Sequence, residues 1–242
     1  MSRTVAIAGV GPGLGESLAR RFAAEGCSVP LLARTESYLD DLAADLDAGP
    51  GAGLAVPTDL RDLDAVRAAF EEIRETVGPV DALVNHASAS SWTGLRECSV
   101  DEFEAAWEVA ARAGFVASKE AAADMLGETP GATATGGTIL FTGATSAVRG
   151  RAGAVDFTSA KFAVRGLAQS MAQELGSEGI RVAHVVLDGG ILPPDREVDD
   201  PEEFLDPDAI ADTYWGLIDG EGTDTMNVEV HVTNGKREIE FL

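Results

Sequence analysis

The stretch Ala8-Gly9-Val10-Gly11-Pro12-Gly13-Leu14-Gly15 decides how this chain folds. It follows a short apolar run at residues 5–8 and precedes residues 15–26, where apolar side chains recur at helical spacing. Glycines allow a tight turn between a strand and a helix, and they let a ligand approach the backbone closely. Because the amides and dipole at a helix N-terminus favour negative charge, this loop predicts a cradle for a phosphate.

The rest of the chain continues the alternation of strand and helix. Strands are expected at residues 29–33, 54–57, 80–85, 138–142, 181–187 and 227–232, and helices at residues 36–46, 62–77, 100–126, 160–175 and 208–218. This order predicts a single doubly wound α/β domain of the Rossmann type over residues 1–242. We expect a parallel sheet of about seven strands with helices on both faces. Residues 192–207, rich in proline and acidic side chains, form either a lid over a substrate cleft or a plain surface loop.

Composition argues against several classes of protein. No apolar run approaches the roughly 18 residues of a membrane span, and the N-terminus lacks a signal-peptide pattern, so we expect a cytoplasmic protein. Two cysteines, Cys27 and Cys98, are too few for a disulfide framework. The histidines, His86, His184 and His231, lack metal-ligand spacing, so no metal site is expected.

The formal net charge is −23, from 41 acidic and 18 basic side chains. Nucleic acid and anionic membranes are therefore poor partners for this surface. Self-repulsion on this scale destabilises a compact state in dilute buffer, which suggests a protein adapted to a salt-rich cytoplasm. An ordinary acidic protein is the alternative.

The spacing Gly-x-x-x-Gly-x-Gly at Gly9, Gly13 and Gly15 resembles that of the short-chain dehydrogenase/reductase family. The resemblance extends over essentially the whole chain. Four further segments carry it: Thr58-Asp59-Leu60, Val84-Asn85-His86-Ala87-Ser88, Phe157-Thr158-Ser159-Ala160-Lys161 and Asp188-Gly189-Gly190-Ile191.

The resemblance implies a bound nicotinamide dinucleotide, a small-molecule carbonyl or hydroxyl substrate, and a homodimer or homotetramer. The helices at residues 100–126 and 160–175 would form the interface between copies. The positions that match the family's cofactor contacts are Gly9, Gly13, Leu14, Gly15, Ala33, Arg34, Asp59, Leu60, Asn85, Ala87, Lys161, Gly189 and Ile191.

The end of the second strand indicates which dinucleotide is bound. An acidic residue there would bond the ribose hydroxyls of NAD, whereas an arginine accommodates a 2′-phosphate. The chain has Arg34 and no acidic residue at positions 33 to 35, so we expect NADP(H) rather than NAD. The alternative is that Arg34 pairs with Glu36 or Asp59.

The resemblance also implies that three of the family's four catalytic residues are replaced in this chain. The family's proton-donating tyrosine is replaced by Phe157, its serine by Ala144 and its helix asparagine by Ala110, which leaves Lys161 of the four. This pattern resembles a divergent branch that lacks the tyrosine. Phenylalanine has no exchangeable proton, so the usual mechanism cannot run through position 157. Lys161 would still hold the nicotinamide ribose.

Other polar side chains near these positions are candidates for the proton donor. Ser146, with Thr145, lies just past the serine position, and Asp188 replaces a proline at the nicotinamide end, where desolvation would raise its pKa. Further candidates are His86 near the cofactor path, Asp156, interpreted as facing solvent, and Tyr214, interpreted as core packing with Trp215.

Two functions follow from these residues. In the first, which the resemblance implies, the chain would be an NADP(H)-dependent oxidoreductase with a non-tyrosine proton donor and with Lys161, Ser146 and Asp188 as catalytic candidates. The alternative is a catalytically inactive dinucleotide-binding sensor or scaffold. The family resemblance favours the first, and the loss of three catalytic positions favours the second.

The charge generates a prediction about salt. Near 1 M salt the Debye length falls to about 3 Å, so repulsion among the acidic side chains is screened. We expect the melting temperature to rise steadily as KCl is raised toward molar concentration. A melting temperature that stays flat or falls would contradict adaptation to salt.

Overall fold

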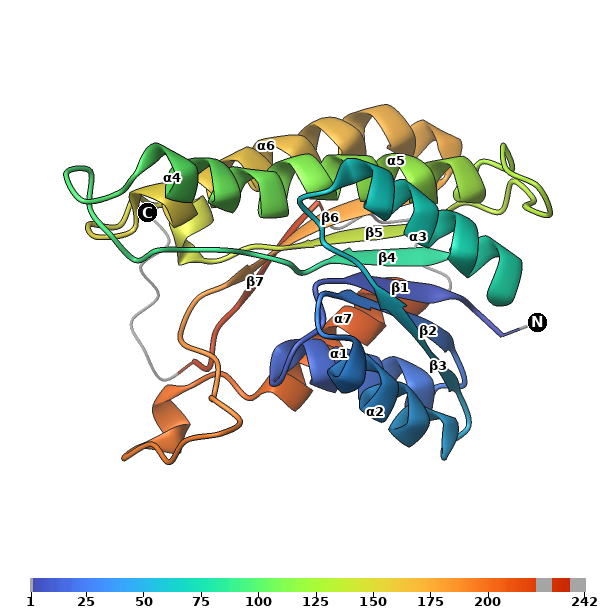
Figure 1. Ribbon diagram of the computed structural model, residues 1–242, viewed down its shortest axis with the longest axis horizontal. Helices are drawn as coiled ribbons and strands as arrows, with labels where there is room; N and C mark the ends of the chain where they lie inside the picture. The colour runs from blue at the N-terminus through green and yellow to red at the C-terminus, as the bar shows by residue number, and fades with distance from the viewer. Residues whose placement is uncertain (1, 221–227, 236–242) are drawn as a thin grey trace.

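The computed structural model describes residues 2–220 and 228–235 (Figure 1). The strands and helices alternate in the order β1 (Val5–Ala8), α1 (Leu14–Ala24), β2 (Ser28–Ala33), α2 (Glu36–Asp47), β3 (Ala52–Pro57), α3 (Leu63–Thr76), β4 (Ala82–Asn85), α4 (Val100–Trp107), α5 (Ala113–Met125), β5 (Gly137–Thr142), α6 (Val155–Leu175), β6 (Ile180–Leu187), α7 (Pro207–Asp219) and β7 (Glu229–Val232). Short helical turns lie at Thr145–Ala147, Gly176–Glu178 and Pro201–Glu203.

All seven strands are parallel, in the order β3-β2-β1-β4-β5-β6-β7. The chain starts at β1 in the middle, winds outward to β3, and then returns to β4 on the other side of β1. In such a sheet, ligands bind outside the carboxyl ends of the strands at the point where the winding reverses. That point lies between β1 and β4, and the glycine-rich loop follows β1. The predicted doubly wound sheet is confirmed.

Helices cover both faces of the sheet (Figure 1). On one face α1, α2 and α7 pack over a core that includes Phe22, Leu39 and Tyr214. On the other face α3, α4, α5 and α6 pack over a core that includes Phe70 and Met125. Among the described residues, no helix combines the length and hydropathy needed to cross a membrane.

The helix expected at residues 100–126 is interrupted by one wide turn. A capping box, in which Ser99 and Glu102 bond each other's backbone amides, begins α4. Residues Glu108–Arg112 then form a π-helical segment before α5 continues. Such segments are frequent at functional sites. Ala110, the position expected for the family's asparagine, lies within it and is buried.

Most elements begin within two residues of the expected positions, and α6 departs most from them. α6 starts at Val155 instead of residue 160, so Phe157 lies in its first turn. The residues before 160 lack apolar periodicity, and hydrogen bonds at Asp156 from distant residues help to hold that turn. The last strand was expected from residue 227, which lies outside the described residues, and β7 begins at Glu229.

The glycine-rich loop generates a prediction about stability. Gly9 has φ +102, and a Cβ there would lie 2.5 Å from Ala87 Cα. Left-handed backbone alone costs an L-residue roughly 1–2 kcal/mol, and the overlap would add to it. We expect Gly9→Ala to lower the free energy of unfolding by at least about 2 kcal/mol in denaturant titrations at fixed KCl.

Gly11→Ala is the matched control in the same loop. A Cβ on Gly11 meets nothing within 4 Å, and Gly11 is not among the positive-φ glycines. Its free energy of unfolding should stay within about 0.5 kcal/mol of the parent value. Equal effects of the two substitutions would show that the contact with Ala87 is not the constraint.

Candidate functional site

Two cavities meet at the carboxyl edge of the sheet. The first, of about 690 Å³, lies between the glycine-rich loop and the ends of β2, β3 and β4. The second, of about 890 Å³, lies among the ends of β5 and β6 and the start of α6. His86 and Ser88 line both cavities, so the two adjoin along this edge of the sheet. Their volumes are those of small-molecule sites.

The glycine-rich loop forms one wall of the first cavity. The amides of Gly9 and Val10 donate to Leu32 O of β2, which ties the loop to the sheet. Gly13 is the N-cap of α1 and supplies no side-chain oxygen to the first turn. The amide of Glu16 donates to Gly11 O, so the amides of Leu14 and Gly15 are the ones left in this turn for the oxygens of a ligand. Pro194 Cδ lies 3.6 Å from where a Cβ of Gly13 would be, so residues 192–207 reach over this loop.

Arg34 stands at the end of β2 on the rim of the first cavity and is exposed. Within residues 2–220 and 228–235 it forms no ion pair or hydrogen bond, so the pairing with Glu36 or Asp59 is not seen there. Its guanidinium is thus available to a ligand in the first cavity.

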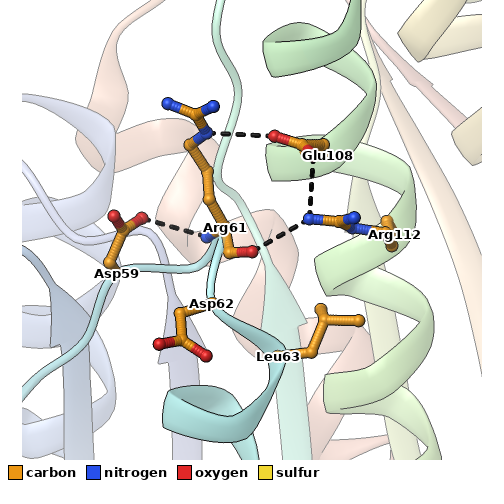
Figure 2. Close-up of a pocket in the computed structure, with 6 residues that line it drawn as sticks. All are labelled: Asp59, Arg61, Asp62, Leu63, Glu108 and Arg112. Carbon is orange, nitrogen blue, oxygen red and sulfur yellow. Dashed lines mark hydrogen bonds and ion pairs between the residues drawn. The ribbon is translucent and has the colours of Figure 1, made fainter.

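The loop after β3 is held by the π-helical segment (Figure 2). Arg61 donates its amide to Asp59 Oδ1 at 3.0 Å and its Nε to Glu108 Oε2 at 3.0 Å. Arg112 donates to Arg61 O at 2.9 Å and pairs with Glu108. Glu108 and Arg112 stand at the two ends of the π-helical segment. That turn therefore fixes the rim residues Asp59 and Leu60 of the first cavity.

Lys161 lies at the floor of the second cavity. Its side chain is buried, and Nζ donates to Thr142 O at 2.8 Å. Burial lowers the pKa of Lys161 to about 8. The Nζ atom lies 5.5 Å from the centroid of the Phe157 ring, so the position where the resemblance predicts a tyrosine is beside the ammonium.

The other catalytic candidates line the same cavity. Ser146 is buried, and Asp188 is half-buried. Asp188 Oδ1 accepts a hydrogen bond of 2.6 Å from Thr145 Oγ1. The desolvation that we expected at Asp188 is therefore partial. Lys161, Ser146 and Asp188 are brought together around one space.

His86 and Tyr214 belong to a hydrogen-bonded chain through Thr142. The Thr142 hydroxyl lies 3.1 Å from His86 Nδ1 and 2.8 Å from the Tyr214 hydroxyl. Burial, and then the charge of Lys161, lower the pKa of His86 to about 4, so its imidazole is neutral near pH 7. Tyr214 is buried in the core, as expected, and burial raises the pKa of its hydroxyl.

The cleft gathers most of the expected contact residues. The first cavity is lined by Gly9, Ala33, Arg34, Asp59, Leu60 and Ala87, and the second by Ser146, Lys161, Asp188, Gly189 and Ile191. Gly13, Leu14 and Gly15 form the turn and the first residues of α1 beneath the first cavity.

Two expectations about side chains need correction. Asn85 turns away from the cleft, and its Nδ2 donates to Ser118 Oγ at 3.0 Å between β4 and α5. Asp156 does not face solvent, since it is 1% exposed and accepts the Ser91 amide at 2.6 Å. The loop that folds back to Asp156 also brings Trp92 into the second cavity. Sequence reasoning missed Trp92 because this loop has no periodic pattern.

Comparisons with known proteins agree with this geometry. The family model described as short chain dehydrogenase matches residues 3–194. The chain is 33% identical over 184 residues to a meso-2,3-butanediol dehydrogenase of Serratia marcescens, covering 76% of this chain and 70% of that protein.

Solved structures share the fold. An alcohol dehydrogenase from Thermococcus sibiricus, complexed with 5-hydroxy-NADP, has a TM-score of 0.86 and 23% identity, covering 99% of this chain and 100% of that one. L-sorbose reductase of Gluconobacter frateurii, complexed with NADPH and L-sorbose, has a TM-score of 0.86 and 24% identity, covering 97% of each chain. These similarities show a shared fold.

Proposed function

The chain belongs to the short-chain dehydrogenase family, and from that premise we propose that it is an NADP(H)-dependent oxidoreductase acting on a small carbonyl or hydroxyl compound. The observation that carries the proposal is the cleft made by the two adjoining cavities, with Arg34 in the lining of one and Lys161 in the lining of the other. A dinucleotide spans such a cleft at the carboxyl edge of a doubly wound sheet.

The described residues fit NADP(H). The positive-φ glycines Gly9 and Gly13 leave room where side chains would block a pyrophosphate, and the N-terminus of α1 favours its charge. Arg34 suits a 2′-phosphate, because guanidinium binds phosphate oxygens through paired N–H groups. Lys161 would hold the ribose next to the nicotinamide. When bound, the dinucleotide supplies or accepts a hydride.

The cofactor assignment generates a prediction at Arg34. We expect Arg34→Ala to weaken NADPH binding by at least about tenfold, because a charge-assisted hydrogen bond is lost. NADH binding should change little. Calorimetric titration of both nucleotides into parent and variant measures the two constants.

Arg67→Ala is the control, since Arg67 pairs with Asp64 on the surface of α3. It should leave both constants unchanged. Tighter binding of NADH than of NADPH by the parent protein would overturn the assignment.

Lys161 is the proton source that we propose for carbonyl reduction. It is the cationic group at the floor of the second cavity, and Phe157 beside it offers no proton. Thr145, Ser146 and Asp188 provide hydroxyl and carboxylate groups that can orient the substrate oxygen. Because the pKa of Lys161 is about 8, its ammonium form is lost above that pH.

Turnover and its pH dependence test this proposal. We expect NADPH to be oxidised by some member of a panel of aldehydes, ketones and quinones in molar KCl. The rate should fall as pH rises through about 8, because the proton on Lys161 Nζ is lost. Lys161→Met should abolish turnover.

A catalytically inactive sensor or scaffold is the second candidate. Phe157, Ala144 and Ala110 stand where the usual catalytic residues are expected, and the Phe157 ring packs on Trp92. Tight NADPH binding without turnover across the panel would favour this candidate. Turnover that appears only in the double variant Phe157→Tyr, Ala144→Ser would show that catalysis was lost at these positions.

We propose two further features of the protein. Residues 192–207 act as a lid. Pro194 approaches Gly13, and Leu192 N donates a hydrogen bond of 2.9 Å to Leu205 O at the base of the segment.

Copies of the chain associate through the outer face of α4, α5 and α6. That face carries Phe103, Trp107, Phe115 and Phe162, each between 39% and 49% exposed.

A further inference from the structure

An aromatic wall closes one side of the second cavity. The rings of Trp92 and Phe157 have centroids 5.0 Å apart at an interplanar angle of 37°. Trp92 is 56% exposed and lines the cavity, so part of the indole remains available to a ligand. Packed aromatic pairs of this kind offer a large apolar surface to a planar molecule.

Trp92, one of the two residues of this wall, has a strained backbone conformation. Trp92 has φ +53 and is the one non-glycine residue with positive φ among residues 2–220 and 228–235. Such strain persists where the surroundings enforce it and clusters at ligand sites. Here Asp156 accepts the Ser91 amide at 2.6 Å and the Ser91 hydroxyl at 3.0 Å, while Trp92 N donates to Ser90 Oγ at 3.1 Å. The hydrogen bonds between Ser91 and Asp156 therefore hold the neighbouring residue Trp92 against the first turn of α6.

Arg151 adds a cation to this wall. Its guanidinium lies 5.4 Å from the centroid of the Trp92 ring, and Arg151 is exposed. Stacking on an aromatic face leaves the in-plane N–H groups of a guanidinium free to bind a carboxylate in bidentate fashion. In the described part of the chain, no acidic side chain bonds to Arg151.

Among the described residues, the lining of the second cavity is less acidic than the chain as a whole. Apart from Arg149, which has a partner of its own, its charged side chains are the basic Arg151 and Lys161 and the acidic Asp188. The whole chain has 18 basic and 41 acidic side chains. Local positive charge in a cleft raises the local concentration of anions. An anion that the rest of the surface repels is thus attracted to the second cavity.

We infer that the second cavity selects carbonyl substrates with a planar, unsaturated body that carries a carboxylate. Trp92, supported by Phe157, contacts the planar body, and Arg151 binds the carboxylate. The carbonyl end then lies toward Lys161, which flanks the Phe157 ring on the cavity floor. This inference rests on the proposed function, because it takes the second cavity as the substrate side of the cleft.

A matched pair of substrates tests the carboxylate. We expect 4-carboxybenzaldehyde to be reduced with at least about tenfold higher kcat/KM than methyl 4-formylbenzoate, since the ester removes the charge and keeps the ring. Arg151→Gln should abolish that preference, and Arg67→Gln on α3 should preserve it. Equal kcat/KM for acid and ester in the parent protein would overturn the inference and leave the proposed function standing.

A binding measurement separates this inference from turnover. Calorimetry should show that 4-(hydroxymethyl)benzoate binds the NADP-saturated protein, with affinity reduced about tenfold or more in Arg151→Gln. The cyclohexane analogue, 4-(hydroxymethyl)cyclohexanecarboxylate, should bind more weakly than the aromatic acid. Binding of this kind without any NADPH oxidation would support the inference while refuting the proposed reaction. Binding that is unaffected by Arg151→Gln would overturn the inference.

Discussion

The close approach of the chain at Gly9 to the chain at Ala87 is the constraint on which the cleft depends. Ala8 O, at the end of β1, accepts the amides of His86 and Ala87, and Gly9 N donates to Leu32 O on the other side. The loops after β1, β2 and β4 are thereby drawn together at the point where the winding of the sheet reverses. A side chain at position 9 would separate them. The rim of the first cavity and the path toward Lys161 both follow from this contact.

Phe157, at the position where the family resemblance predicts a tyrosine, affects the second cavity in two ways. It offers no exchangeable proton beside Lys161, which is why the buried ammonium is the proton source in the proposed reaction. It also creates an apolar surface on which Trp92 packs. A phenylalanine at this position thus suits contact with an aromatic group, while Lys161 keeps the role proposed for it at the ribose.

Charge is distributed unevenly between the surface and the cleft. Acidic side chains exceed basic ones more than twofold in the whole chain, yet among the described residues that line the second cavity Arg151 and Lys161 are basic and Asp188 is acidic. At high salt the long-range field of the surface is screened within a few ångströms. Direct contacts between a guanidinium and a bound anion are screened much less. A site of this design can recognise an anion under conditions in which the surface charge has little effect.

The sequence by itself determined the sheet, the glycine-rich loop and many of the residues along the cleft. Apolar periodicity depends on neighbours along the chain, so it located the seven strands and the main helices, but not the π-helical segment that divides α4 from α5. Arg34 and Lys161 were found because they follow recognisable patterns. The tertiary structure decided what such patterns do not encode: the inward turn of Asp156, the side-chain bond of Asn85 with Ser118, and the position of Trp92. These depend on hydrogen bonds between residues 33 to 66 positions apart, which only the folded chain brings into contact.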